Sequence, residues 1–353
     1  MPQPWIASLQ RAIFTAVLLH GALAVAADDA ARCRAPAGTQ PFEFSFRDSH
    51  LRGFIDFPAG PGPHAAVLVL HGSGGTDVFH HALEYNGQYT ALRNTFRSAG
   101  VATVVWDKAG NGCSTGSYAD GNPIRERAGE AVAALRALKE RRDIDASRMG
   151  IWGISQGGWV APMVAVQTAD VSFLILVSTP GRDAVSQLEY QALTRLRTNG
   201  TPEAEVRAAG MHLRLAFALM RAGGSREAYA AAVAPLQKYT ALRDLGILSG
   251  TQESYSAWQN SMDYQYRPDT ALRELQQPVL AVFGERDVLV DWRDSEQIFR
   301  ESFRAGGNPD LTIKVFPNAD HNLMTAGPDP QFVQGYLPLL HDWLHRHLDR
   351  RGP

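Results

Sequence analysis

Six short apolar runs, alternating with segments of helical periodicity, constrain the fold of this chain more than any other feature of its sequence. The runs are nearly free of polar residues, as expected for strands covered on both faces, which is the condition of a parallel sheet. They span residues 65–72, 101–107, 148–155, 171–178, 278–284 and 311–317. Between them apolar residues recur at helical spacing, as at Val132, Leu135 and Leu138. We therefore predict an α/β fold, a doubly wound and mostly parallel sheet, with an antiparallel edge from residues 42–46 and 51–57.

The alternation stops between residues 181 and 276, where the pattern is purely helical. A helix start at Thr201 and Pro202 is followed by an apolar face that ends at Gly223. We interpret this stretch as a helical cap inserted into an α/β core of residues 27–180 and 277–353. Its large apolar side chains are candidate substrate contacts, and the alternative is that they pack the cap's own helices. These candidates are Met211, Phe217, Met220 and Trp258.

The N-terminal segment has the pattern of a secretory signal. Arg11 precedes an apolar run, and small residues around Ala26 offer a cleavage site, so we predict a signal peptide over residues 1–26 and a periplasmic or secreted protein. The run is too short for a comfortable membrane span, which needs about 20 residues, so no stable anchor is expected after cleavage. An uncleaved anchor is the alternative. Cys33 and Cys113 would both be exported, where they could form a disulfide or remain two thiols.

The charge balance points to a small molecule as the partner. The chain has 34 basic and 36 acidic residues and a formal net charge of −2. Such a balance gives no sign of binding to nucleic acid or to an anionic surface. The oligomeric state is not indicated by the sequence.

Ser155 lies in "GISQGG", between a predicted strand and a predicted helix. A serine on so sharp a turn needs small neighbours, because side chains at Gly153 or Gly157 would collide with the adjoining strand and helix. The turn would expose the hydroxyl and aim the helix N-terminus at it. We therefore predict Ser155 as a nucleophile, the alternative being a polar residue in a glycine-rich turn.

A serine nucleophile needs a base and an orienting carboxylate, and two later strands end in suitable residues. Asp287 follows the run 278–284, and His321 follows the run 311–317. Both would lie at carboxyl ends of parallel strands, where open α/β sheets place their sites. We predict Ser155, Asp287 and His321 as a catalytic triad. Competing carboxylates for the role of Asp287 are Glu285, Asp291 and Asp320.

The loop "HGSGGTD", residues 71–77, follows the first long apolar run. Its glycines would let backbone N–H groups point at the charge that develops on a tetrahedral carbonyl oxygen. The predicted oxyanion donors are the N–H groups of Gln156 and of Ser73 or Gly74. A phosphate cradle is the alternative, but no Lys followed by Ser or Thr is present.

With these motifs the sequence resembles the α/β-hydrolase fold superfamily, and within it the bacterial serine hydrolases with a helical cap. The resemblance covers roughly residues 42–348 and rests on "HGSGG", "WDKAGNGCSTG", "GISQGG", "GERD" and "NADHNL". It implies hydrolysis of a carboxylic ester, a thioester or sometimes an amide, with no cofactor. The loop that begins at Asp107 departs from the family pattern, because Ala109 stands where an arginine is usual, so any salt bridge of that arginine is absent.

The preferred hypothesis is a serine carboxylesterase that acts through an acyl-enzyme on a small-molecule ester. The alternatives on the same machinery are an aminopeptidase-like peptidase, a thioesterase or a carbon–carbon hydrolase. A peptidase would place an acidic residue in the cap, where Glu203, Glu205, Glu227 and Glu253 are available. A noncatalytic binding protein would lack a triad member, and none is missing. His341 and His345 have the spacing of zinc ligands, but no third ligand is evident, and we predict no metal site.

Overall fold

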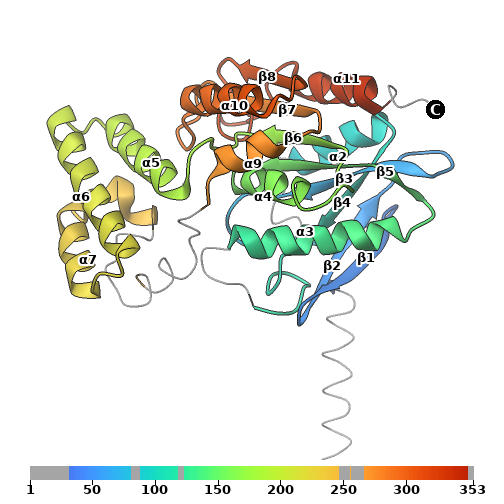
Figure 1. The fold of residues 1–353 in the computed structure, drawn as a ribbon, viewed down its shortest axis with the longest axis horizontal. Coiled ribbons are helices and arrows are strands. Elements are labelled where there is room, and N and C mark those ends of the chain that lie inside the picture. The colour runs from blue at the N-terminus through green and yellow to red at the C-terminus, as the bar shows by residue number, and fades with distance from the viewer. Residues whose placement is uncertain (1–31, 81–87, 118–122, 246–254, 256–265, 349–353) are drawn as a thin grey trace, which may run out of the picture.

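The computed structural model describes residues 32–80, 88–117, 123–245, 255 and 266–348, and everything below refers to these residues (Figure 1). Eight strands form one sheet in the order β1-β2-β4-β3-β5-β6-β7-β8. The strands are β1 (Gln40–Phe46), β2 (Ser49–Asp56), β3 (His64–Leu70), β4 (Val101–Trp106), β5 (Ile144–Ile154), β6 (Phe173–Val177), β7 (Val279–Gly284) and β8 (Leu311–Phe316).

The strand pairing confirms the predicted fold class. β1 pairs with β2 and β2 with β4 in antiparallel fashion, whereas every pair from β4 to β8 is parallel. The central strands β3, β6 and β7 are buried along almost their whole length, as their apolar sequences predict. β8 differs from the prediction, because most of its residues are partly exposed. It is an edge strand with one neighbour, and Thr312 and Lys314 in its sequence fit that position.

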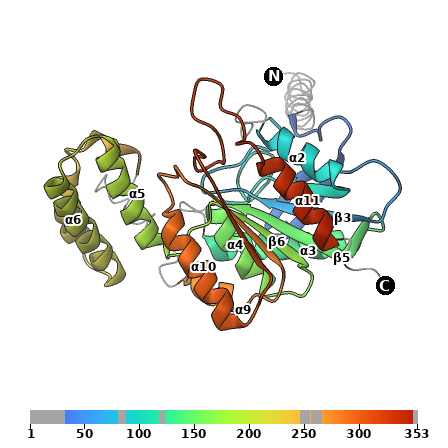
Figure 2. The ribbon, with the colours of Figure 1, turned by 90° about the horizontal axis from the view of Figure 1, so that it is seen from above.

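Helices cover both faces of the sheet (Figures 1 and 2). On one face α3 (Ile124–Lys139), α4 (Gln156–Ala165), α9 (Pro268–Glu274) and α10 (Trp292–Gly306) share a hydrophobic core with one set of strand side chains. On the other face α2 (Gln88–Ser98) and α11 (Tyr336–Leu348) pack on the alternate set. Neighbouring residues of one strand therefore serve different cores, as Leu68 and Val69 of β3 do.

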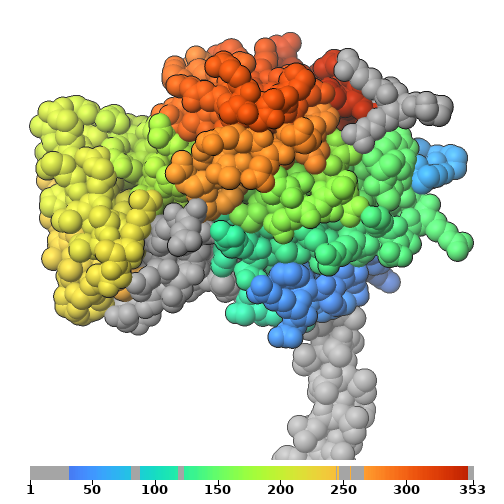
Figure 3. Space-filling model, in the orientation of Figure 1, coloured from blue at the N-terminus to red at the C-terminus, as the bar shows by residue number. Residues whose placement is uncertain are grey.

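The predicted helical stretch lies between β6 and β7. It contains α5 (Ala184–Thr198), α6 (Glu203–Arg221), α7 (Arg226–Val233) and the short 3₁₀ helices η1 (Ala234–Leu236) and η2 (Thr240–Leu245). These helices, which we call the insertion, have a hydrophobic core of their own and form a separate lobe beside the sheet (Figure 3). α9 falls within the predicted stretch 181–276, yet Leu272 packs in the core of the sheet. The described boundary between insertion and core therefore lies before α9.

Trp159 on α4 contacts both ends of the helical stretch. Its indole Nε1 donates a hydrogen bond to the carbonyl of Pro180, 2.7 Å away, at the start. At the end, the hydroxyl of Tyr266 donates to the carbonyl of Trp159 at 2.9 Å, and the two rings meet edge to face. One residue of α4 thus binds, through its side chain and its backbone, the points where the chain leaves the core and returns.

Cys33 and Cys113 form a disulfide, which decides between the two states that the sequence left open. The bond joins the segment before β1 to the loop after β4. Among the described residues, no helix combines the length and the apolar character that crossing a membrane requires. The predicted signal peptide, residues 1–26, lies outside the described part of the chain.

Candidate active site

Ser155 lies on the sharp turn from β5 into α4, where the sequence predicted it. Its backbone has φ 55° and ψ −120°, a conformation that an L-residue rarely adopts and that costs about 1–3 kcal/mol. Ser155 holds this conformation while its N–H donates to the carbonyl of Val177 on β6, 2.9 Å away. The strain is typical of a residue whose side chain is presented for chemistry rather than for packing.

The flanking glycines are required by close backbone contacts. A Cβ atom on Gly157 would lie 2.0 Å from the carbonyl oxygen of Leu70, at the end of β3. One on Gly153 would lie 2.5 Å from the carbonyl oxygen of Gly157. Both distances are far below contact, so α4 can start against β3 and β5 only if these positions have no side chain. The pattern around Ser155 is therefore explained by packing that lifts the serine out of the sheet.

His321 and Asp287 are in direct contact. His321 Nδ1 and Asp287 Oδ2 are 2.8 Å apart, and the carboxylate is fully buried while the imidazole is 12% exposed. The other carboxylate oxygen, Oδ1, accepts the N–H groups of Leu289 at 2.8 Å and Val290 at 2.9 Å. Three hydrogen bonds thus fix the carboxylate, and a neutral imidazole that donates through Nδ1 has its acceptor at Nε2.

The competing carboxylates have other roles in the described structure. Asp320 Oδ1 accepts the N–H groups of Asn322 and Met324, each at 2.8 Å, and so shapes the loop that carries His321. Asp291 caps α10 through the N–H of Asp294. Glu285 contacts the N–H of Asn318 at 3.4 Å. Of the four candidates, Asp287 is the one that contacts the histidine.

The three predicted residues come from one edge of the sheet. Ser155 follows β5, Asp287 lies just after β7, and His321 follows β8, so all three stand at carboxyl ends of parallel strands. The loops after β7 and β8 approach closely, because a Cβ atom on Gly284 would lie 2.2 Å from the carbonyl oxygen of Asp320. Transfer of the serine proton to His321 stays a prediction.

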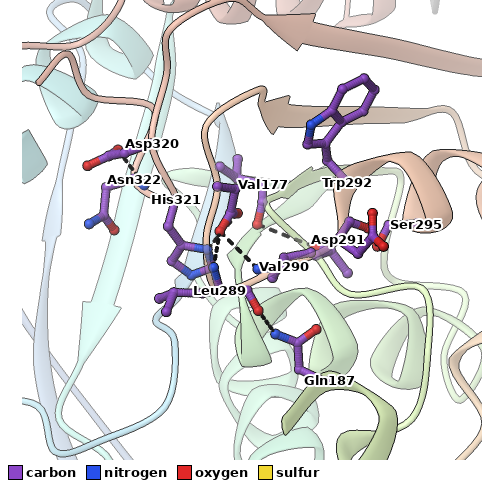
Figure 4. A network of polar contacts seen from close by, with 12 residues as sticks. Val177, Gln187, Leu289, Val290, Asp291, Trp292, Ser295, Asp320, His321 and Asn322 are labelled. Atoms are coloured by element: carbon purple, nitrogen blue, oxygen red, sulfur yellow. Dashed lines mark hydrogen bonds and ion pairs between the residues drawn. The ribbon is translucent and has the colours of Figure 1, made fainter. Parts of the chain in front are cut away.

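The insertion reaches the same edge through α5. Gln187 donates its side-chain amide to the carbonyl of Leu289 (Figure 4). The hydroxyl of Tyr190 donates to the carbonyl of Asp287 at 3.4 Å. Both acceptors belong to the turn that holds the carboxylate. The insertion therefore touches the backbone that positions Asp287.

The predicted oxyanion donors lie on two adjoining segments. Gln156 is the first residue of α4, and Ser73 and Gly74 lie in the loop after β3. Gly72 brings that loop to the nucleophile, since a Cβ atom on it would be 3.4 Å from Ser155 Cβ and 3.9 Å from Ser155 Oγ. The assignment of these N–H groups as donors stays a prediction.

The predicted substrate contacts in the insertion have different environments. Phe217 and Met220 are buried in the insertion's own core, at 2% and 3% exposure, whereas Met211 is 62% exposed on α6. Trp258 lies outside the described residues. Contact of these side chains with substrate stays a prediction.

Other histidines and acidic residues that the sequence singled out have local partners. His341 lies beside Asp342 and meets the ring of His345 edge to face, and the described residues contain no cluster suited to a metal ion. Of the acidic residues considered for binding an amine, Glu203 pairs with Arg197 and Glu205 with Lys238. Glu227 pairs with Arg226, and Glu253 lies outside the described residues.

A buried group of ionisable side chains contacts residues 71–74 of the loop after β3, which we call the 71–74 loop. The sequence analysis missed this group. Lys108 follows β4, and Arg127 and Glu130 lie on α3; all three are at most 5% exposed. Arg127 and Glu130 stand beside the buried Ala128 and Ala131, so a signal existed: charged residues on an apolar helix face. Ala109 leaves the loop without an arginine, and the buried arginine here comes from the helix instead.

The buried charges also determine the protonation of neighbouring groups. Burial, helped by the charges of Lys108 and Arg127, lowers the pKa of His71 to about 3, so this imidazole is neutral at physiological pH. Burial lowers the pKa of Lys108 well below its usual range and raises that of Glu130. His71 therefore cannot add a further positive charge beside the loop.

Comparison with known proteins agrees with this fold. The chain is 24% identical over 323 residues to the esterase EstD of Thermotoga maritima, covering 90% of this chain and 67% of that protein. The esterase Pf2001 of Pyrococcus furiosus superposes with a TM-score of 0.56 at 16% identity, covering 88% of this chain and 90% of its own. The proline iminopeptidase of Mycobacterium smegmatis gives a TM-score of 0.56 at 20% identity, covering 89% and 100%.

A family model provides the assignment. The model described as Hydrolase_4, serine aminopeptidase S33, matches residues 61–326. That match spans the turn at Ser155, the loop after β3, and both later site residues. The chain has the α/β-hydrolase fold and belongs to the Hydrolase_4 family of serine hydrolases.

Proposed function

We propose that this protein is a serine hydrolase that cleaves carboxylic esters through an acyl-enzyme. The observation that carries the proposal is the Asp287–His321 hydrogen bond at the same sheet edge as the strained Ser155. Support comes from the relatives, since EstD of Thermotoga maritima and Pf2001 of Pyrococcus furiosus are both named esterases.

In the proposed mechanism His321 Nε2 takes the proton of Ser155 as Oγ attacks the ester carbonyl. The C=O double bond becomes a single bond, and its oxygen carries the negative charge that the N–H groups of Ser73 and Gln156 stabilise. Collapse re-forms the C=O bond and breaks the bond to the alcohol, which leaves with the proton from His321. Water then repeats the sequence with His321 as base, releasing the acid and restoring Ser155. Asp287 holds the imidazole and stabilises its charged form.

The first test is Ser155→Ala on turnover of a short-chain aryl ester. We expect kcat to fall by about 10⁴-fold or more, because the remaining residues have no nucleophile to activate. The matched control is Ser147→Ala, an exposed serine before the buried part of β5, which should keep wild-type turnover. Circular dichroism verifies that both variants are folded. Turnover by Ser155→Ala within tenfold of wild type would refute the proposal.

Amide hydrolysis is the second candidate, favoured by the description of the family model and by the iminopeptidase neighbour. The described acidic residues of the insertion that we considered are each paired with a basic side chain, which does not favour them as receptors for a free amine. Matched aryl ester and aminoacyl anilide substrates distinguish the two. We expect the ester to be preferred, and a higher kcat/KM for the anilide would select the peptidase.

We also propose that the protein is exported, with residues 1–26 removed. The disulfide supports this, because such bonds persist mainly in oxidising compartments. The test is expression of the full chain in a Gram-negative host, followed by fractionation and N-terminal sequencing. We expect mature protein in the periplasm or medium, beginning near Ala27. Full-length protein in the cytosolic fraction alone would contradict export.

A further inference from the structure

Lys108 is a buried lysine whose direct hydrogen-bond partners, among the described residues, are backbone carbonyls rather than a carboxylate. It is 4% exposed, and its ammonium donates to the carbonyl of Gly72 at 2.8 Å and to that of Gly74 at 2.6 Å. Because β4 lies beside β3 in the sheet, a residue just after β4 can reach the loop that follows β3. Lys108 thus binds the loop predicted to supply an oxyanion donor.

Arg127 holds the same loop from α3. Its guanidinium donates through Nη2 to the carbonyl of His71 at 2.5 Å and through Nη1 to that of Gly72 at 3.4 Å. Nη1 also donates to Oε1 of the Gln156 side chain at 2.9 Å. Arg127 therefore links both segments that carry the predicted N–H donors, the loop after β3 and the first turn of α4.

These contacts determine which way the peptide groups face. In a trans peptide the C=O and the following N–H point in opposite directions. Holding the Gly72 carbonyl toward Lys108 and Arg127 turns the N–H of Ser73 away from them. Gly72 itself borders Ser155, as the 3.4 Å contact described above shows. With the carbonyl released, its negative end could turn toward the nucleophile, where it would repel a developing oxyanion.

The cluster is poorly explained by stability alone. Lys108, Arg127 and Glu130 are three buried ionisable side chains, and Glu130 Oε1 accepts the N–H of Ala109 at 3.3 Å. Removing charges from water carries a penalty of several kcal/mol per ion, which their attraction offsets only in part. Burial accordingly lowers the pKa of Lys108. Lys108 and Arg127 are buried beside a candidate catalytic loop in spite of this penalty. We therefore look for their role in the reaction.

We propose that Lys108 and Arg127 are positioning residues, which hold the 71–74 loop so that the N–H of Ser73 faces the oxyanion. This rests on the proposed serine hydrolase function. The two residues act through the loop. Their positive charge, placed behind the donor, also favours the negative charge of the tetrahedral intermediate.

The test compares Lys108→Met with Lys139→Met, a matched change at a half-exposed lysine that pairs with Asp170 on the surface. For Lys108→Met we expect kcat on an aryl ester to fall by about 10–100-fold with KM changed less than about threefold, since the lost interaction acts in the transition state. The inhibition constant of a trifluoromethyl ketone, which forms an oxyanion with the serine, should rise in step with the loss of kcat/KM. Lys139→Met should match wild type in all three quantities.

Lys108→Gln separates the hydrogen bonds from the charge. Glutamine keeps N–H donors without a positive charge, so we expect it to regain part of the rate lost in Lys108→Met. If Lys108→Met fails to fold, Arg127→Lys replaces it, because lysine keeps the charge but cannot make the forked contacts. Its kcat should fall by about tenfold. A folded Lys108→Met or Arg127→Lys with kcat within twofold of wild type, or with ketone affinity unchanged, would overturn the proposal.

Failure of the ester proposal is recognised separately, by labelling Ser155 with a fluorophosphonate. As the serine attacks this reagent, negative charge develops on the phosphoryl oxygen, which occupies the oxyanion position. If the wild-type protein is labelled but hydrolyses no ester, the proposed substrate class is wrong. The positioning role can then still be tested by comparing labelling rates. Lys108→Met should then be labelled about 10–100-fold more slowly than Lys139→Met. Equal labelling rates would overturn the positioning role itself.

Discussion

Gly157 shows how one absent side chain sets the geometry of the candidate site. A methyl group at this position would have backbone atoms of Leu70 and His71 within 3 Å, and backbone cannot rotate away as a flexible side chain can. The serine turn, the start of α4 and the end of β3 are therefore fixed together. A residue chosen for packing thereby determines where a nucleophile stands.

We expect Gly157→Ala to lower the free energy of unfolding by about 1–3 kcal/mol or more, and to reduce ester turnover, because β3 or α4 must shift. The matched change is Gly210→Ala within α6, where the three atoms nearest to the added methyl group belong to the side chains of Arg214 and Leu193, at 3.4–3.5 Å. That variant should be neutral or gain up to about 1 kcal/mol from helix propensity. Urea unfolding measures both. Equal effects at the two glycines would contradict the packing explanation.

Asp107 is a buried carboxylate that holds the loops around the site. Its Oδ1 accepts the N–H of Val78 at 2.7 Å and its Oδ2 that of Cys113 at 2.9 Å. Burial nevertheless dominates and raises its pKa from 3.8 to about 6. The folded state therefore favours the protonated form more than the unfolded chain does. This contribution to stability is fully present below about pH 3.8 and is lost as the pH rises through about 6.

Asp107→Asn should remove this pH dependence, because asparagine does not titrate. The variant should also be less stable, because the amide NH₂ is a donor that faces a backbone N–H, another donor. We expect the difference in free energy of unfolding between wild type and variant to narrow by up to about 3 kcal/mol between pH 4 and 7. Asp170→Asn is the control with opposite sign, since the Lys139 ammonium lowers the pKa of Asp170. The stabilisation by this pair is present above about pH 3.8 and is lost as the pH falls below it, so the difference from wild type should stay nearly constant between pH 4 and 7 and shrink at lower pH. A widening for Asp107→Asn would show that its pKa is lowered instead.

At the scale of elements, the disulfide links two segments that the sheet alone does not join. Cys113 stands in the loop after β4 whose first residues are Asp107 and Lys108. The 80-residue separation of the cysteines encloses β1 to β4 and α2. The bond therefore restricts the unfolded chain over the part of the molecule that supports the 71–74 loop.

We expect the double variant Cys33→Ala with Cys113→Ala to lose about 2–4 kcal/mol of unfolding free energy, because the unfolded chain regains the freedom of the closed loop. Urea unfolding with and without a thiol reductant measures this. Reductant should destabilise wild type by a similar amount and leave the double variant unchanged. A variant as stable as the oxidised wild type would show that the bond contributes nothing.

At the scale of the whole molecule, the sequence predicted features with a local signature. The buried strands have apolar sequences, and Ser155, Asp287 and His321 each follow such a strand, so their arrival at one sheet edge follows from parallel topology. The contact of His321 with Asp287, rather than with the nearby carboxylates, depended on turn geometry that no spacing shows.

Features that depend on contacts between distant segments could not be predicted. Lys108, just after β4, and Arg127, on α3, donate to carbonyls of the 71–74 loop. The sequence around either residue does not indicate those acceptors. The exposure of β8 follows from its place at the sheet edge, which apolar content does not reveal. The pairing of Cys33 with Cys113 likewise needed the fold.

Trp159 allows the insertion to change in evolution independently of the turn that carries Ser155. Because its indole and backbone secure Pro180 and Tyr266, the chain departs from and rejoins the core at anchored positions beside α4. A segment exchanged between those anchors leaves the attachment to α4 in place, provided that it keeps the contacts of Gln187 and Tyr190 with the turn at Asp287. Substrate range in a protein built this way can diversify by replacement of one segment, and chimeras for directed evolution have natural junctions at residues 180 and 266.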